Sequence, residues 1–216
     1  MIRKSYFGVS SMLKNIRNIL RDRIIIQNYK QQLQNQTPCI ISSNCIGGII
    51  YHDLQLPFLS PTINLFFYTQ DYLKFIGKLK YYLSINLLPS KSVNGTEYPV
   101  GLLDDIEVHF LHYKDFKDAA IQWQKRVNRV DFDNLFFIMT DQNGCTYEQI
   151  KYFDTLQYKN KVIFTHKSYP EFNSAFYIKG FENNNEVGNL INIKKYSLKR
   201  YFEDFDYVSF FNGGQK

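Results

Sequence analysis

Short apolar segments alternate with segments of helical periodicity along most of this 216-residue chain, and this alternation limits the possible folds more than any other feature. The apolar segments are rich in Ile, Val, Phe and Tyr, and three segments between them repeat apolar residues every three or four positions. Apolar strands separated by helices are typical of a buried, mostly parallel sheet that is covered on both faces. The expected strands are 38–42, 62–67, 106–111, 134–139, 161–165 and 175–179, and the expected helices are 70–82, 115–129 and 146–156.

The length of the chain suits one full-sized domain and is short for two. We therefore expect an α/β fold, with one three-layer α/β/α domain and a mostly parallel, Rossmann-like sheet over residues 36–210. A basic amphipathic helix in residues 1–35 is expected to pack on or beside this domain. Residues 211–216 are expected to form a flexible tail.

The positive charge of the chain is concentrated at its start. Residues 1–30 carry seven basic side chains and one acidic one, whereas the rest of the chain holds 19 of each sign. The body is therefore not expected to bind nucleic acid. The basic helical face is either a solvated face of a packed helix or a surface that lies on anionic lipid at the inner face of the membrane, through residues 10–30.

Cysteine usage and hydropathy indicate a cytoplasmic protein. The three cysteines are odd in number and form no CxxC pair, which fits a reducing compartment. The charges near the start interrupt any signal-peptide core, and no apolar run is long enough to span a membrane. The four histidines form no zinc pattern with the cysteines, so no metal site is expected.

The ends of three expected strands carry polar and nucleophilic residues. In open α/β sheets, ligands bind beyond the carboxyl ends of the strands, where loops and helix N-termini converge. We therefore expect a site at that edge of the sheet, with a thiol, a carboxylate, an imidazole and an amine. The residues after the three strands are Ser43, Asn44, Cys45, Gly47 and Gly48, then Thr140, Asp141, Gln142 and Asn143, then His166 and Lys167.

The segment SSNCIGG places Cys45 at a strand-to-helix corner. A thiol there lies at the positive end of the helix dipole, which lowers the pKa of the thiol. His166 or His52 is the candidate base. The alternative is a small buried cysteine in a tight turn, which is the commoner environment of free cysteines. His52 and Asp53 lie about two helical turns beyond Cys45, so we expect them to line the pocket rather than to exchange a proton with the thiol.

Arg126 and Arg129 lie three positions apart near the end of an expected helix. Paired arginines suit a phosphate or a carboxylate, so Arg126 is a candidate ligand-binding residue. Basic residues at a helix C-terminus are also favoured by the helix dipole, and this second interpretation requires no ligand.

Several blocks of the sequence resemble one bacterial family. The blocks are IISSNCIGGIIYHDLQLPFLSPTINLFF, YLKFIGKLKYYLS and NLFFIMTD, within a resemblance that covers roughly residues 10–210. They are similar to the domain of unknown function DUF1919, whose members are often labelled exopolysaccharide or capsule biosynthesis proteins. The resemblance implies a single α/β domain and a polysaccharide setting, but no catalytic assignment. The first block defines the family through Ser43, Asn44, Cys45, Gly47, Gly48, Asp53, Pro61 and Asn64.

Three functions are compatible with these features. The first, slightly favoured, is a transferase that moves an acyl group from acyl-CoA to a cell-surface saccharide or its lipid-linked precursor. Cys45 or His166 would then act as nucleophile or base, and the Gly47–Gly48 turn would donate N–H groups to an oxyanion.

The second is a glycosyltransferase that uses a nucleotide-sugar. In that case the turn would hold the diphosphate, Arg126 or Lys167 would offset its charge, and Asp141 would act as base or metal ligand. The third is a non-catalytic sugar-binding or assembly protein of the same machinery.

Overall fold

The computed structural model describes residues 15–90 and 97–214, which form two compact units. The larger unit comprises residues 37–188, and the smaller unit combines residues up to 36 with residues from 189 onward. Residues 189–210, which the sequence analysis grouped with the sheet, thus contact the N-terminal helix.

The larger unit is built on a parallel four-stranded sheet with strand order β1-β5-β6-β7. The strands are β1 (Cys39–Ser42), β5 (Leu135–Thr140), β6 (Lys161–Thr165) and β7 (Ala175–Tyr177), and all three pairings are parallel. The expected α/β fold with a mostly parallel sheet is therefore confirmed. Four of the six expected apolar segments form these strands. In β1, β5 and β6 the Ile, Val and Phe residues are buried on both faces of the sheet, whereas the edge strand β7 is half-buried.

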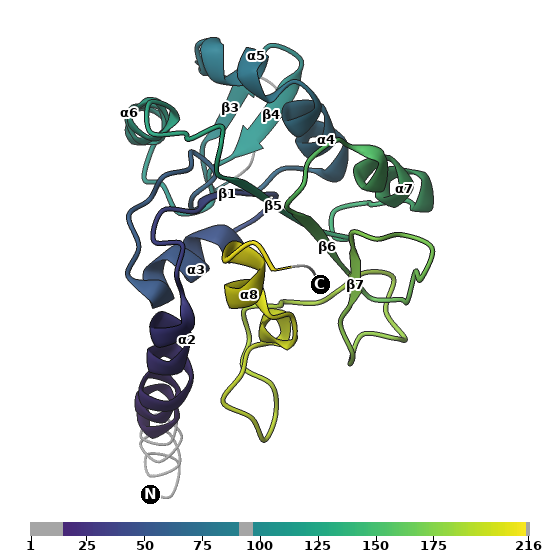
Figure 1. Cartoon of the computed structure of the whole chain (residues 1–216). Coiled ribbons are helices and arrows are strands. Elements are labelled where there is room, and N and C mark those ends of the chain that lie inside the picture. The colour runs from purple at the N-terminus through teal and green to yellow at the C-terminus, as the bar shows by residue number, and fades with distance from the viewer. Residues whose placement is uncertain (1–14, 91–96, 215–216) are drawn as a thin grey trace, which may run out of the picture. The chain divides into compact units, whose positions relative to one another are not determined.

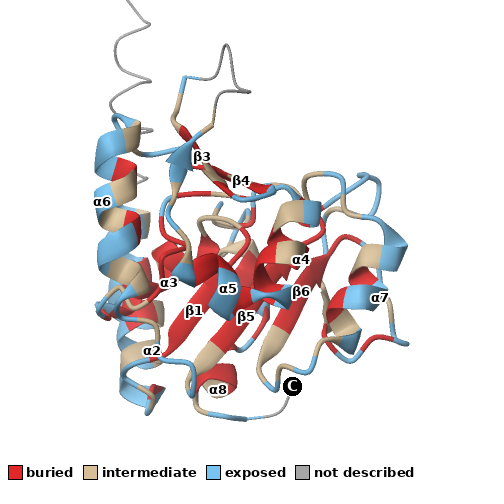
Figure 2. Ribbon diagram, turned by 90° about the horizontal axis from the view of Figure 1, so that it is seen from above, coloured by how far each residue is buried: buried red, intermediate tan, exposed pale blue. Residues whose placement is uncertain are grey.

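Helices of the larger unit cover both faces of the sheet (Figure 1). On one face lie α4 (Thr69–Gly77), α6 (Phe116–Val127) and α7 (Tyr147–Thr155), whose inner residues share one core with Ile41, Phe137 and Ile163. On the other face lies α3 (Ile46–Leu54). Figure 2 shows burial concentrated along β1, β5 and β6, as expected for the middle layer of three.

Gly47 lets α3 pack closely on β1. A Cβ atom at Gly47 would lie 3.0 Å from the Cβ of Ser42 and 3.2 Å from a methyl group of Ile40. Such contacts are tighter than ordinary van der Waals packing, so a larger residue would push the helix away from the strand. Gly48 has more room, because its nearest neighbour would be 3.5 Å away.

Two expectations about the larger unit are wrong in detail. Residues 62–67 form no strand apart from one bridge between Phe66 and His109, because Asn64 adopts a left-handed conformation and the Thr62 side chain bonds to the edge of β1. The helix expected over 70–82 is divided at Lys78 into α4 and α5 (Leu79–Ser84).

A second, antiparallel sheet contains the segment expected as a strand at 106–111. It consists of β2 (Leu88–Pro89), β3 (Val100–Leu103) and β4 (Ile106–His109), in that order. The sequence analysis counted this segment with the parallel sheet. The short turn between β3 and β4, with Asp104 in a left-handed conformation, instead makes it half of a hairpin.

The smaller unit is helical. Residues 15–21 are α-helical and continue through the π-helical turn η1 (Asp22–Ile26) into α2 (Gln27–Gln32). The later part of the unit contains the 3₁₀ turn η2 (Tyr201–Asp204) and α8 (Tyr207–Phe211). The expected helical N-terminus is confirmed for the described residues, and the part of the expectation that concerns residues 1–14 lies outside them.

Two buried contacts join the helix to the later segment. Arg21 forms a buried ion pair with Glu203, and the rings of Tyr29 and Tyr207 meet edge to face at 5.1 Å. Phe211, which the sequence analysis placed in a flexible tail, is buried in α8. The smaller unit therefore has a packed interior of its own.

Candidate functional site

The carboxyl ends of β1, β5 and β6 meet at one edge of the parallel sheet. The backbone N–H of Ser43 donates to the carbonyl of Ile138 at 2.9 Å, and the N–H of Asp141 donates to the carbonyl of Phe164 at 3.0 Å. These bonds extend the strand ladders by one residue. They bring the residues that follow the three strands into one neighbourhood.

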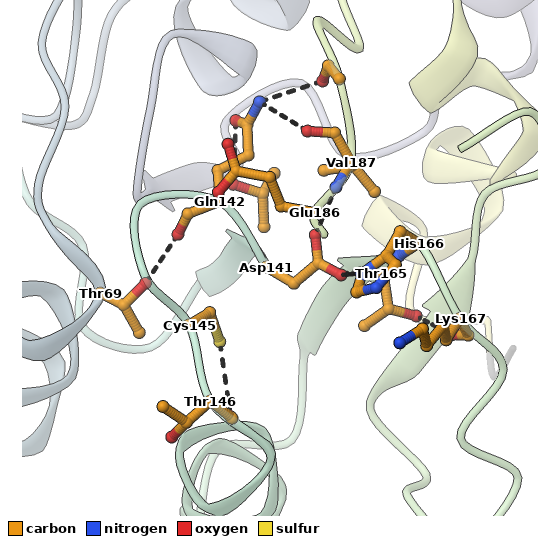
Figure 3. A network of polar contacts seen from close by, with 12 residues as sticks. Thr69, Asp141, Gln142, Cys145, Thr146, Thr165, His166, Lys167, Glu186 and Val187 are labelled. Atoms are coloured by element: carbon orange, nitrogen blue, oxygen red, sulfur yellow. Dashed lines mark hydrogen bonds and ion pairs between the residues drawn. The ribbon is translucent and has the colours of Figure 1, made fainter. Parts of the chain in front are cut away.

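Asp141 and His166 form a buried pair at this edge (Figure 3). Oδ2 of Asp141 lies 2.5 Å from Nδ1 of His166 and also accepts the backbone N–H of His166 at 2.7 Å. Oδ1 accepts the backbone N–H of Val187 at 2.8 Å. Both carboxylate oxygens are therefore used to hold groups of the protein, and the ring of His166 has one fixed orientation.

The pairing determines which ring nitrogen of His166 carries the proton. A carboxylate can only accept hydrogen bonds, so Nδ1 donates and, in the neutral ring, Nε2 keeps its lone pair. Nε2 is buried and has no hydrogen-bond partner within the protein. A buried acceptor without a partner is costly and calls for an explanation, and proton transfer is one role that an oriented imidazole can fill.

A network of side-chain amides joins the ends of β1 and β5. Asn44 donates from Nδ2 to the Thr140 hydroxyl and to Oε1 of Gln142, at 3.2 Å each. Nε2 of Gln142 donates to the carbonyls of Val187 and Gly188 at 3.0 Å. The segment 186–188 is thereby attached to the ends of two strands, and its Val187 N–H helps to position Asp141.

Cys45 is held in a different way from His166. It is half-buried at the start of α3, and its thiol lies 3.7 Å from the carbonyl oxygen of Leu65, to which it donates. Burial raises the pKa of the Cys45 thiol above its usual value. Both facts favour the neutral thiol, as in the interpretation of Cys45 as a packed residue in a turn.

The first turn of α3 brings backbone N–H groups to the same edge. Oδ1 of Asn44 accepts the N–H of Ile46, and the Ile49 N–H donates to the carbonyl of Cys45. The N–H groups of Gly47 and Gly48 lie between these two and belong to the turn that begins the helix, where such groups have no earlier carbonyl in the helix to bind. They are the groups that the sequence analysis proposed for an oxyanion or a diphosphate.

The side chains of the other sequence candidates lie outside this network, and Lys167 contributes only its backbone carbonyl, which accepts the Thr165 hydroxyl at 2.7 Å. Arg126 donates to the Tyr113 hydroxyl, with its guanidinium carbon 5.5 Å from the centre of the Phe58 ring. Asn64 and Lys167 are exposed. His52 is exposed next to Asp53, whose side chain is buried.

The structure adds four residues that the sequence analysis did not propose. Thr69 donates from its hydroxyl to the carbonyl of Gln142 at 2.8 Å, and Glu186 accepts the N–H of Asn143 at 2.9 Å. Cys145 lies close to Asp141 and Thr69, and burial raises the pKa of its thiol to about 12. Val187 acts through its backbone alone, so no side-chain pattern could have revealed it.

An aromatic cluster adjoins the site through the residue before Thr69. His109 stacks on Phe66 with ring centres 4.6 Å apart, and it meets Tyr68 and Tyr98 edge to face at 5.1 and 6.0 Å. His109 is buried, and neither ring nitrogen has a hydrogen-bond partner in the described part of the chain. Tyr68 is about half exposed, so the cluster presents a ring surface to solvent.

A groove of about 530 Å³ lies apart from this network, between α4 and α7. Lys74 and Asp105 form an ion pair of 2.7 Å in its lining, and Tyr82 donates to Asp105 at 2.6 Å. Across residues 15–90 and 97–214, no group of three His, Cys, Asp or Glu side chains is arranged to hold a metal ion. None of the helices described in these ranges is long and apolar enough to cross a bilayer.

Comparison with known proteins identifies the family. The model of DUF1919, a domain of unknown function, matches residues 15–212. The chain belongs to this family. It is also 45% identical to an uncharacterized protein of Haemophilus influenzae over 193 residues, which cover 89% of this chain and 93% of the relative. The family model, which matches residues 15–212, includes parts of both units and every residue of the strand-end network.

Proposed function

We propose that this DUF1919 protein is a transferase that acylates a hydroxyl group of a saccharide, with His166 as the general base. The observation that carries the proposal is the Asp141–His166 pair, because it fixes the orientation of the imidazole and leaves Nε2 without a hydrogen-bond partner. An imidazole held in this way is suited to removing a proton from a hydroxyl group.

The reaction requires one proton to move twice. Nε2 of His166 takes the proton of the acceptor hydroxyl as its oxygen forms a bond to the acyl carbon of acyl-CoA. The bond between that carbon and the sulfur of coenzyme A then breaks, and the leaving thiolate takes the proton back from the imidazolium. Asp141 stabilises the imidazolium between the two transfers.

The negative charge that develops on the acyl oxygen needs hydrogen-bond donors. The N–H groups of Gly47 and Gly48 begin α3, and Asn44 connects this turn to Thr140 and Gln142 at the end of β5. Donors at a helix start favour negative charge. We assign them to the oxyanion, as the sequence analysis proposed.

The aromatic cluster supports a saccharide as acceptor. The apolar C–H face of a sugar ring packs on an aromatic face, and a tyrosine adds a hydroxyl that can bond to the sugar. Tyr68 is the exposed ring of the cluster, and the next residue, Thr69, is bonded to Gln142 beside Asp141. We therefore place the sugar on Tyr68, with its reacting hydroxyl directed toward His166.

The donor also implies a location. Acyl-CoA is a cytoplasmic metabolite, so the proposed reaction takes place in the cytoplasm, at the inner face of the membrane if the acceptor is a lipid-linked precursor. The polysaccharide setting comes from the family resemblance and forms part of the proposal.

Glycosyl transfer from a nucleotide-sugar is less well supported. In that reaction Asp141 would act as base or metal ligand, yet each of its oxygens already accepts a hydrogen bond from the protein. Arg126, the candidate partner of a diphosphate, is bonded to Tyr113.

Release of free coenzyme A from a panel of acyl-CoAs, measured with a thiol reagent in the presence of saccharide acceptors, tests the proposal. We expect release that depends on both substrates and that is lost in His166→Gln but retained in Cys45→Ser. Loss in Cys45→Ser with retention in His166→Gln would contradict the assignment of the base. Turnover of nucleotide-sugars alone would favour glycosyl transfer, and saccharide binding with no turnover would favour the non-catalytic alternative.

A further inference from the structure

The helix of the smaller unit has an inverted arrangement of charged and apolar side chains. Arg17 and Arg21 point into the unit, where Arg17 donates to the carbonyl of Lys194 at 2.9 Å and Arg21 pairs with the buried Glu203. Four large apolar side chains in the earlier part of the same helix are instead exposed, whereas Ile26 is buried. Their exposed fractions are 43% for Ile16, 53% for Ile19, 43% for Leu20 and 54% for Ile24.

These four residues form one stripe, because their spacings of three and four positions place them on one side of a helix. A stripe of exposed isoleucine and leucine loses hydrophobic free energy in water unless another surface covers it. The described residues of the smaller unit therefore present an apolar surface that is suited to contact with something else.

A loop of the same unit carries a second exposed apolar group. The loop is closed by a hydrogen bond of 2.9 Å from the N–H of Lys194 to the carbonyl of Lys199. Tyr196 lies at its tip with 93% of its surface exposed and a left-handed backbone conformation. The ammonium group of Lys195 lies 4.9 Å from the centre of the Tyr196 ring. An exposed tyrosine surrounded by lysines is typical of the interface between water and lipid.

The charge of the chain is divided between the two units. Residues 1–36 and 189–216 together carry 12 basic and four acidic side chains, a net charge of +8, whereas residues 37–188 carry a net charge of −2. A basic surface with exposed Ile, Leu and Tyr side chains is complementary to an anionic bilayer, which offers both phosphate charge and apolar depth.

We propose that the smaller unit docks on an anionic lipid bilayer through the stripe Ile16, Ile19, Leu20 and Ile24 and through the loop with Lys195, Tyr196 and Lys199. The stripe and the Tyr196 ring enter the headgroup region, while the lysines contact lipid phosphates. This contact is larger than the lipid contact expected through residues 10–30, because it includes a loop that lies about 180 residues from the helix along the chain. It is independent of the reaction proposed for the larger unit.

Co-sedimentation of the full chain with vesicles tests the proposal. The probes are vesicles of phosphatidylcholine alone and of phosphatidylcholine mixed with phosphatidylglycerol in equal parts. We expect binding to the mixed vesicles that weakens with added salt, and little binding to the neutral ones. Removal of one charge in Lys199→Gln should lower the partition coefficient about fivefold. Ile19→Gln and Tyr196→Asn should also lower it, and Asn tolerates the left-handed conformation at position 196.

A matched control is available in the larger unit. Ile121 on α6 is 53% exposed, the same fraction as Ile19, so Ile121→Gln makes the same chemical change on a different surface. We expect Ile121→Gln to bind vesicles as the wild type does. Equal weakening by Ile121→Gln and Ile19→Gln would overturn the proposal. So would an absence of binding to the mixed vesicles, including a case in which the chain binds RNA or a protein partner instead.

Discussion

Two residues at the same edge of the parallel sheet, Cys45 and His166, differ in what surrounds them. Cys45 begins a helix, but its thiol donates to the Leu65 carbonyl and burial raises its pKa. His166 follows β6, and Asp141 fixes its orientation while Nε2 stays without a partner. The comparison shows that a position at a strand end brings a residue to the site, whereas its neighbours decide its reactivity.

The largest expected effect is on the acyl transfer proposed for this edge. His166→Gln should lower the rate about 10²- to 10⁴-fold, because it removes the general base. Cys45→Ser should change the rate little, because the proposed mechanism uses no thiol. Release of coenzyme A by the two variants and the wild type measures both effects. Equal losses of coenzyme A release in His166→Gln and Cys45→Ser would contradict the different roles assigned to the two residues.

Asp141→Asn should lower both activity and stability. An amide at this position cannot accept from all three N–H groups that the carboxylate holds, so one buried donor loses its partner. We expect a loss of about 1–3 kcal/mol in the free energy of unfolding, measured by urea denaturation. The same variant should have lower kcat, since His166 is no longer fixed in one tautomer. Full activity in Asp141→Asn would show that the pair is structural.

Substitutions at Gly47 and Gly48 test how closely α3 packs on β1. Gly47→Ala should lower the free energy of unfolding by about 1–3 kcal/mol, because the new Cβ would lie 3.0 Å from that of Ser42. Gly48→Ala is the control, since its Cβ has ordinary contacts and alanine is the better helix former. Chemical denaturation of both variants measures the difference. If both variants lose the same stability, close packing of α3 on β1 is not the reason for Gly47.

Alkylation separates a reactive thiol from a packed one. Burial raises the pKa of Cys45, and it raises those of Cys39 and Cys145 to about 12, so all three should react with iodoacetamide more slowly than a free thiol near neutral pH. Mass spectrometry of peptides from protein that was treated before unfolding gives the rate at each position. Preferential labelling of Cys45 at neutral pH would instead indicate an activated nucleophile.

The smallest expected effect comes from His109, the second buried histidine of the larger unit. Burial lowers its pKa, against a weaker opposite influence of Glu107. The unfolded chain therefore binds more protons than the folded one just below the ordinary histidine pKa of about 6.5. The free energy of unfolding should rise with pH toward about 6.5, and His109→Phe should flatten that rise. An unchanged slope in His109→Phe would mean that other groups cause it.

The sequence was sufficient to predict the parallel sheet and the edge of the sheet at which Asp141 and His166 lie. Apolar runs such as NLFFIM form strands because their residues are buried on both faces, and the position after each run brings Asp141 and His166 together. The sequence could not show that these two side chains would meet. Their contact depends on the pairing of β5 with β6 and on the Val187 backbone, 46 residues from Asp141.

For the helix at the start of the chain, the sequence predicts the helix itself but not the side on which it packs. Its period is correct, but the side on which it packs is not the apolar side that the pattern suggests. The buried ion pair of Arg21 with Glu203 decides the orientation, and the partner lies 182 residues away. A local pattern cannot contain that information.

The protonation of the His166 ring is the most direct test of the central claim, because it needs no substrate. Nitrogen NMR of the chain labelled at histidine, with His166→Gln to assign the signal, reports which ring nitrogen carries the proton. We predict that the neutral ring carries its proton on Nδ1, hydrogen-bonded to Asp141, and that Nε2 carries none. A proton on Nε2 in the neutral ring would contradict the claim that this atom is the base.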